Sequence, residues 1–180
     1  ALERLEDTLL NCVSRQLVAD VPVGCFLSGG VDSSLLVMAC AELRKRSGGV
    51  SHPLKTFSIG YKESEFDETP HAAEMARAFG AEHRQLIAEP KDFFDLIPDV
   101  PLYFDQPFAD PTLLPSLLLS RFAREEVTVA LSGDGGDELF FGYSQQRALL
   151  GLRHLRMLPR SLRTAAFEAL RHVTGVLPGN

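Results

Sequence analysis

The sequence is poor in cysteine and has no long apolar run. None of its apolar stretches approaches the twenty or so residues of a membrane span, and its acidic, amphipathic start does not fit a signal peptide. Its cysteines, Cys12, Cys25 and Cys40, show no C-x-x-C spacing, so a zinc site or a disulfide framework is not expected. Their apolar neighbours predict buried, reduced thiols in a cytoplasmic protein, and burial would keep Cys25 from acting as a nucleophile.

Basic residues are also in deficit. The chain has 18 Lys and Arg residues against 24 Asp and Glu residues, which gives a formal net charge of −6 at pH 7. This balance argues against a nucleic-acid-binding surface, and we expect neither a nucleic acid nor a membrane as a partner. A length of 180 residues, 45% of them hydrophobic, suffices for one globular domain with a sizeable core.

Residues 23–34 combine a short apolar run, a glycine turn and the start of a helix that we expect over residues 31–46. A strand that turns through glycines into a helix N-terminus directs several backbone N–H groups at one point, where the helix dipole favours an anion such as phosphate. Gly29 and Gly30 let the backbone come close to a ligand. Asp32 suits a divalent cation held between it and phosphate oxygens. We interpret this stretch as a site for a Mg-nucleotide or pyrophosphate, with hydroxyl donors from Ser28, Ser33 and Ser34.

Two better-known phosphate loops do not match this stretch. No lysine lies between Val21 and Arg44, so the loop is not of the Walker A type, and an adjacent glycine pair does not make a dinucleotide fingerprint. The alternative is a plain tight turn in which Asp32 and the serines cap the helix, although capping needs only one such side chain.

A second acidic glycine turn, residues 132–138, follows a buried strand that we expect over residues 127–131. The two turns would face one ligand from neighbouring strands. The acids Asp134, Asp137 and Glu138 would repel ATP unless a metal intervenes, and a Mg²⁺ shared by Asp32 and Asp137 is the simplest arrangement. Asp134 then remains for substrate contact or proton handling. A tight acidic surface turn without a ligand is the alternative.

The rest of the chain alternates strands and helices, which predicts an α/β fold: a doubly wound, mainly parallel sheet with helices on both faces. Ligands of such sheets gather at the carboxyl ends of the strands, so Ile59 and Gly60 are expected beside the nucleotide. His71 is interpreted as a solvated residue on a helix face. The other expected elements are helices over residues 2–17, 67–79, 92–100 and 112–126, strands over 54–61 and 82–88, an irregular loop over 99–111, and a helical, basic region from residue 145.

Four motifs, in order along the chain, carry a resemblance to a known family. They read SGGVDS at residues 28–33, TFSIG at 56–60, FDQPFADP at 104–111 and SGDGGDE at 132–138. The first resembles the pyrophosphate loop of the ATP pyrophosphatase (PP-loop) superfamily. Together, over residues 21–143, they are similar to the synthetase domain of glutamine-hydrolysing asparagine synthetases of the bacterial type, which implies an adenine nucleotide alpha hydrolase-like fold.

The resemblance implies an ATP-dependent, AMP-forming amide ligase with ATP and Mg²⁺ as cofactors. Such an enzyme adenylates the side-chain carboxylate of L-aspartate, releases pyrophosphate, and forms L-asparagine with glutamine-derived ammonia. Asp134 is the candidate catalytic residue, and Asp32 and Asp137 are the candidate metal ligands. The residues expected to bind ATP or pyrophosphate are Phe26, Leu27, Ser28, Gly29, Gly30, Asp32, Ser33, Ser34, Ile59, Gly60, Ser132 and Gly133.

The resemblance also implies a domain plan and partners. Residues 1–180 are expected to form part of a synthetase domain, with a docking helix at 1–20, a nucleotide-binding core at 21–143 and a helical C-terminal part at 144–180. The expected partners are ATP, aspartate, ammonia and the glutaminase domain of the same full-length chain, a domain that we expect to be absent here. A homodimer is left open.

Three departures from the family pattern accompany the resemblance. Gln106 stands where the family commonly has glutamate, Phe141 replaces a glycine, and no lysine follows Lys91, although relatives carry a catalytic lysine beyond this region. We therefore expect an incomplete enzyme. The alternatives are a related ligase or cyclase that acts on another carboxylate, and a non-catalytic ATP-binding module.

Overall fold

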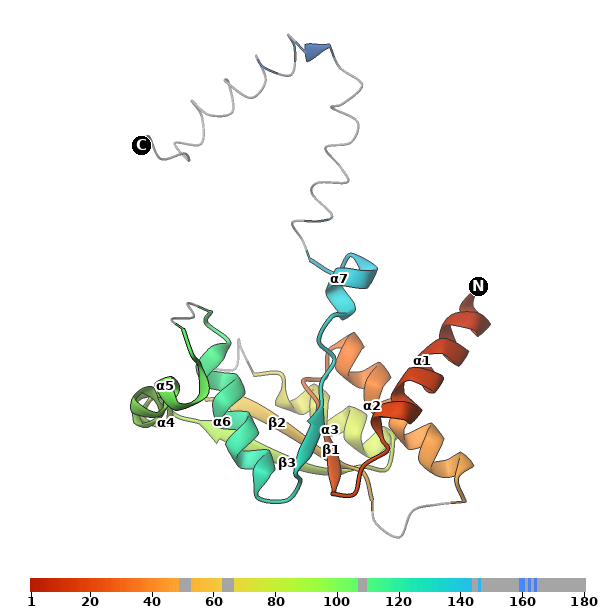
Figure 1. Cartoon of the computed structure of the whole chain (residues 1–180), viewed down its shortest axis with the longest axis horizontal. Coiled ribbons are helices and arrows are strands. Elements are labelled where there is room, and N and C mark those ends of the chain that lie inside the picture. The colour runs from red at the N-terminus through yellow and green to blue at the C-terminus, as the bar shows by residue number, and fades with distance from the viewer. Residues whose placement is uncertain are drawn as a thin grey trace. The chain divides into compact units, whose positions relative to one another are not determined.

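The computed structural model describes residues 1–48, 53–62, 67–106 and 110–143, together with residues 146, 159, 160, 162 and 164. The chain divides into two compact units, Ala1–Asp134 and Gly135–Asn180. The first unit contains the sheet and the helices around it (Figure 1). Within the described residues, no helix is both long and apolar enough to cross a membrane.

The centre of the first unit is a parallel sheet of four strands in the order β3-β2-β1-β4. The strands are β1 Val23–Phe26, β2 Lys55–Tyr61, β3 Glu82–Ala88 and β4 Val129–Leu131. The chain moves outward from β1 to β2 and β3 and then returns to place β4 on the other side of β1 (Figure 1). The direction of winding therefore reverses between β1 and β4, and in open α/β sheets ligands bind at the carboxyl ends of the strands at such a point.

Helices cover both faces of the sheet, which confirms the predicted α/β class. On one face, α1 Leu2–Gln16, α2 Val31–Arg46 and α3 Thr69–Ala78 pack on Cys25 of β1 and on Leu27, which follows that strand. On the other face, α6 Leu113–Arg124 packs on Phe57, whose ring meets the Phe122 ring edge to face at 6.0 Å. Val23 and Cys25 of β1 belong to the first of these layers and Phe26 to the second, as expected for successive residues of a central strand.

The segment after β3 differs in part from the prediction. A helix over residues 92–100 and an irregular loop from residue 99 were expected, whereas the chain forms α4 Pro90–Leu96, the short 3-10 turn η2 Ile97–Asp99 and α5 Val100–Tyr103. A capping box between Glu89 and Asp92 starts α4 earlier, with Pro90 in the first helical position. Pro98 and Pro101 likewise lie in the first turns of η2 and α5, where a missing N–H costs little.

The cysteine prediction is confirmed for two of the three thiols. Cys25 and Cys40 are fully buried, but Cys12 is exposed, so the prediction for Cys12 was wrong. The reason is helical geometry: α1 buries Leu10 and Val13, and Cys12 lies on another face of the same turn. In the second unit, the described helix is α7 Gly136–Phe140, and most of the predicted basic helical region lies outside the described residues.

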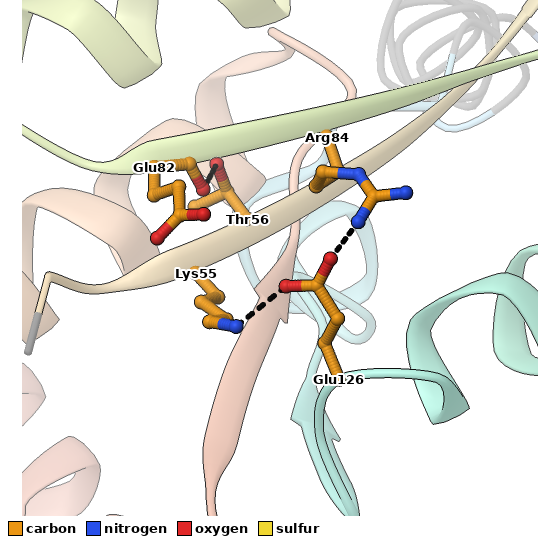
Figure 2. Close-up of polar contacts among 5 residues, drawn as sticks. All are labelled: Lys55, Thr56, Glu82, Arg84 and Glu126. Carbon is orange, nitrogen blue, oxygen red and sulfur yellow. Dashed lines mark hydrogen bonds and ion pairs between the residues drawn. The ribbon is translucent and has the colours of Figure 1, made fainter.

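One carboxylate ties the beginnings of the strands together. Glu126, which precedes β4, accepts from Lys55 at 2.5 Å and from Arg84, and its side chain is 16% exposed (Figure 2). Arg84 also lies over the Phe122 ring, 5.3 Å from its centroid. The network thus joins β2, β3 and the α6–β4 connection at the amino edge of the sheet.

We expect Glu126→Gln to destabilise the chain by about 1–2 kcal/mol, because two neighbouring cations lose their shared partner in a half-buried setting. Glu42→Gln is the matched control: it breaks the exposed Glu42–Arg46 pair of α2 and should cost only about 0.3–0.5 kcal/mol. Urea unfolding of both variants measures the difference. Equal costs would contradict a special role for Glu126.

Two buried hydroxyls of β2 contact His83 of β3, and this arrangement makes the stability of the chain depend on pH. Thr56 Oγ1 lies 2.9 Å from Nδ1 of His83, and Ser58 Oγ lies 3.1 Å from Nε2. Burial lowers the pKa of His83 below its ordinary value. The unfolded chain therefore binds a proton more readily than the folded one, so this contribution to stability is present above about pH 6.5 and is lost as the pH falls through the folded-state pKa.

We expect the urea midpoint of the chain to fall as the pH is lowered from 7.5 to 5, and we expect His83→Gln to flatten that fall. Glutamine keeps a hydrogen-bonding side chain but carries no titrating group. The other histidines are present in both proteins, so the difference between the two pH profiles isolates His83. Parallel profiles would show that His83 does not set the acid sensitivity.

Candidate functional site

The first loop leaves the sheet directly beyond β1. The amide of Leu27 still donates to the Phe57 carbonyl at 2.9 Å, so the backbone follows the sheet for one more residue. The turn comes at Gly29, whose φ of 87° is a left-handed conformation that side chains rarely adopt. Gly30, with φ −67° and ψ 165°, is the N-cap residue of α2. The strand–turn–helix prediction for this stretch is confirmed.

The N-terminus of α2 has no side-chain cap. The amide of Ser34 donates to the Gly30 carbonyl at 3.0 Å. The three amides before it, those of Val31, Asp32 and Ser33, have no acceptor within the described chain. The alternative in which Asp32 and the serines cap this helix is therefore not what the structure shows. Three unpaired amides at the positive end of a 16-residue helix are a ready site for an anion.

Two of the three serines hold the loop in shape. The hydroxyls of Ser28 and Ser33 share a hydrogen bond at 3.0 Å, the Gly30 amide donates to Ser28 Oγ at 3.2 Å, and Ser33 Oγ donates to the Gly30 carbonyl at 3.2 Å. Ser34 differs, because its buried Oγ has no hydrogen-bond partner among the described residues. A buried hydroxyl without a partner is costly, and Ser34 Oγ is a polar atom whose partner the described residues do not supply.

The second loop touches the first. β4 pairs with β1 in parallel, with Leu131 opposite Cys25, and this register brings the residues after β4 to the same edge. A Cβ added to Gly133 would lie 2.8 Å from the amide nitrogen of Ser33 and 3.0 Å from the carbonyl carbon of Asp32. Gly133 therefore allows the backbone of the second loop to pack directly against the Asp32–Ser33 peptide, where no side chain would fit. Beside it, Ser132 Oγ donates to the Asp134 carboxylate at 2.8 Å.

The remaining acids of the second motif belong to the second unit, Gly135–Asn180. Asp137 and Glu138 lie in the first turn of α7, and the Tyr143 hydroxyl donates to Glu138 at 2.7 Å, which lowers the pKa of that carboxyl. Phe141, where the family commonly has glycine, has φ 59°, a left-handed conformation that side chains rarely adopt. The pairing of Asp32 with Asp137 on one metal stays a prediction, and no group of three or more His, Cys, Asp or Glu side chains suited to a metal occurs in the described part of the chain.

The end of β2 and the start of α3 complete this edge. Ile59 and Gly60 lie on β2 beyond its last residue paired with β1, opposite Leu86 and Ile87 of β3. Gly60 packs tightly against Thr69, since an added Cβ would lie 2.5 Å from the Thr69 methyl group. Whether Ile59 and Gly60 contact adenine stays a prediction.

His71 lies beside the first loop, a position that the sequence did not predict. It is exposed, as predicted, but its Cβ also lies against Gly29 in the first loop. The sequence places Gly29 and His71 more than forty positions apart and shows no pattern that links them. Only the packing of α3 on α2 brings them together.

The two buried thiols lie side by side in the core. Their Sγ atoms are 3.7 Å apart. The hydrogen bond to Cys40, together with burial, raises the pKa of Cys25 strongly, so its thiolate form is disfavoured. The same hydrogen bond lowers the pKa of Cys40.

Two hollows of the described surface lie away from the loops. One, of about 730 Å³, lies at the amino edge of the sheet between α1, α2 and the strand beginnings at Val23, Lys55 and Glu82. The other, of about 980 Å³, is lined by residues of α4, α5 and α6. Neither hollow is lined by the residues with unpaired amides, so the candidate site is identified by its hydrogen-bonding groups and not by the size of a cavity.

The sheet and its helices define an α/β protein with two glycine-rich loops side by side at the winding reversal. The chain matches the family model described as "Asparagine synthase" over residues 4–179, and it belongs to that family. It is 38% identical over 178 residues to asparagine synthetase [glutamine-hydrolyzing] 1 of Bacillus subtilis, a match that covers 98% of this chain and 26% of the relative. It is 39% identical over 162 residues to a putative asparagine synthetase 2 of Methanocaldococcus jannaschii, which covers 90% of this chain and 30% of the relative.

The chain thus spans about a quarter to a third of the length of these relatives. Among solved structures, the NH3-dependent NAD synthetase of Campylobacter jejuni superposes with a TM-score of 0.51 at 16% identity, over 80% of this chain and 61% of that one. At that identity the superposition shows a shared fold.

We expect Gly133→Ala to destabilise the chain by about 1–3 kcal/mol, because the new methyl group meets the rigid backbone of Asp32 and Ser33. Gly30→Ala is the control: its φ suits alanine, and the added Cβ would approach only the Ser28 hydroxyl, at 3.2 Å. Thermal unfolding without ligand compares the two. A Gly133→Ala variant as stable as Gly30→Ala would contradict the close contact of the loops.

Proposed function

We propose that this chain is the ATP-binding part of an AMP-forming amide ligase. The proposed reaction adenylates the side-chain carboxylate of L-aspartate, releases pyrophosphate, and forms L-asparagine with glutamine-derived ammonia. The observation that carries the proposal is the uncapped N-terminus of α2, whose unpaired amides lie at the carboxyl edge of the sheet beside Gly133 of the second loop. Membership of the asparagine synthase family supplies the expectation of substrate class.

The residues present fit the pyrophosphate end of ATP. The amides of Val31, Asp32 and Ser33 would donate to its phosphate oxygens, and the orphan hydroxyl of Ser34 would gain a partner. Catalysis of this kind rests on positioning and charge neutralisation, and it needs no nucleophilic side chain. Ser28 and Ser33 act by keeping the loop in shape through their mutual hydrogen bond.

The remaining predicted contacts complete the proposal. Ser132 and Gly133 would lie near the ribose and the α-phosphate, while the backbone at Phe26, Leu27 and Ile59 would meet the adenine edge. Bound Mg²⁺ would neutralise phosphate charge, with the half-buried Asp32 as one ligand and Asp137 as the predicted second. Asp134 is the proposed catalytic residue, exposed on the second loop with its carboxylate oriented by Ser132.

The wider protein is also part of the proposal. Because relatives are about three to four times as long as this chain, we place the aspartate and ammonia steps in the longer protein, together with a glutaminase domain as partner. The same proposal includes the domain plan, with a docking helix at 1–20, a core at 21–143 and a helical part at 144–180. It also includes a cytoplasmic location. Gln106 removes a negative charge where the family commonly has one, so the identity of the acceptor is the part to test first.

We expect Asp32→Asn to reduce ATP–pyrophosphate exchange at least a hundredfold, because the metal and the polyphosphate lose the carboxylate between them. The assay supplies Mg²⁺, labelled pyrophosphate and L-aspartate to the longer protein that contains this chain. Asp20→Asn, an exposed acid ahead of β1, is the control and should leave exchange unchanged.

The outcomes separate the functions considered above. Exchange with a carboxylate other than aspartate would indicate a related ligase or cyclase. Binding of ATP without exchange in the wild-type protein would indicate a non-catalytic nucleotide module. Full exchange activity in Asp32→Asn would contradict the proposal that Asp32 is a metal ligand.

A further inference from the structure

The first turn of α3 lies directly on the first loop. A Cβ added to Gly29 would lie 2.7 Å from the Cβ of His71 and 2.7 Å from the amide nitrogen of Ala72. The contact lies between the backbone of Gly29 and the Cβ of His71, so it fixes the point from which the imidazole extends. His71 is exposed, and its ring has no hydrogen-bond partner within the described chain.

The two loops themselves contain no basic side chain. Residues 22–43 and 127–146 include neither lysine nor arginine, whereas Asp32 and Asp134 are acidic. Pyrophosphate is a highly charged leaving group, and helix amides supply only partial positive charge. His71 lies beside Gly29, and its imidazole can carry a positive charge. It can therefore supply the cation that the two loops themselves lack.

We propose that His71 is a binding residue for the pyrophosphate end of the nucleotide, to which its protonated imidazole donates a charge-assisted hydrogen bond. The inference rests on the proposed function, because it takes the first loop to be the polyphosphate site. Binding of the anion favours the protonated ring, so pyrophosphate binding takes up a proton. The other charged side chains in the first turn of α2 and over residues 67–78 are Asp32, Asp67, Glu68, Glu74 and Arg77.

Calorimetric titration of the whole 180-residue chain with inorganic pyrophosphate and Mg²⁺ at pH 7 tests the inference. We expect His71→Ala to weaken binding about tenfold, a typical effect of losing one charge-assisted hydrogen bond. Arg77→Ala is the matched control: it removes an exposed cation from the same helix, away from Gly29, and should leave binding within about twofold.

Proton uptake distinguishes a ligand contact from a structural role. Repeating the titration in two buffers of different ionisation enthalpy measures the protons taken up on binding. We expect His71→Ala to take up fewer protons than the wild type. His71→Lys, a permanent cation, should keep affinity within about threefold and show the same reduced uptake.

Unchanged binding by His71→Ala would overturn this inference and leave the proposed function standing. An equal loss in Arg77→Ala would also overturn it, because a long-range field and not a contact would then be responsible. A wild-type chain that binds neither pyrophosphate nor ATP would overturn both proposals. Binding of pyrophosphate that depends on His71, without ATP–pyrophosphate exchange in the longer protein, would uphold the inference and reject the proposed function.

Discussion

The first turn of α2 presents three backbone amides without an acceptor in the described chain, and the surrounding structure keeps that turn both fixed and open. The serine hydrogen bonds fix its shape from within. Gly29 and Gly133 allow α3 and the second loop to come into close contact with it, because neither position carries a side chain. Because unpaired amides are costly when shielded from water, such a turn is tolerated where water or an anion can reach it.

The sheet explains why the two loops meet at all. They are about a hundred positions apart in sequence, but β1 and β4 are hydrogen-bonded neighbours with parallel register, so their carboxyl ends coincide. The outward path through β2 and β3 leaves the place beside β1 free for β4. The topology, rather than any single contact, therefore converts two short glycine turns into one site.

The strand–helix alternation, the parallel sheet and the position of the first loop could be predicted, because glycine turns and apolar runs are local signals. Cys12 shows a limit of local reading, since apolar neighbours in sequence do not say which face of a helix is buried. α4 begins at Pro90 because Glu89 and Asp92 form a capping box, a signal that is present in the sequence although the predicted helix began only at residue 92. His71 could not be assigned to the site, because its contact with Gly29 arises only when α3 packs on α2.

The opposite edge of the sheet has a consequence for how the site can adjust. Glu126 clamps the roots of β2 and β3 to the segment that leads into β4, while at the other edge Gly133 rests on the Asp32–Ser33 peptide without any side chain of its own. One end of the sheet is thus braced by ionic struts, and the other relies on contacts between bare backbones. Changes at the two ends should therefore differ in kind: loss of an ion pair loosens the strand beginnings, whereas an added side chain at position 133 pushes the two loops apart.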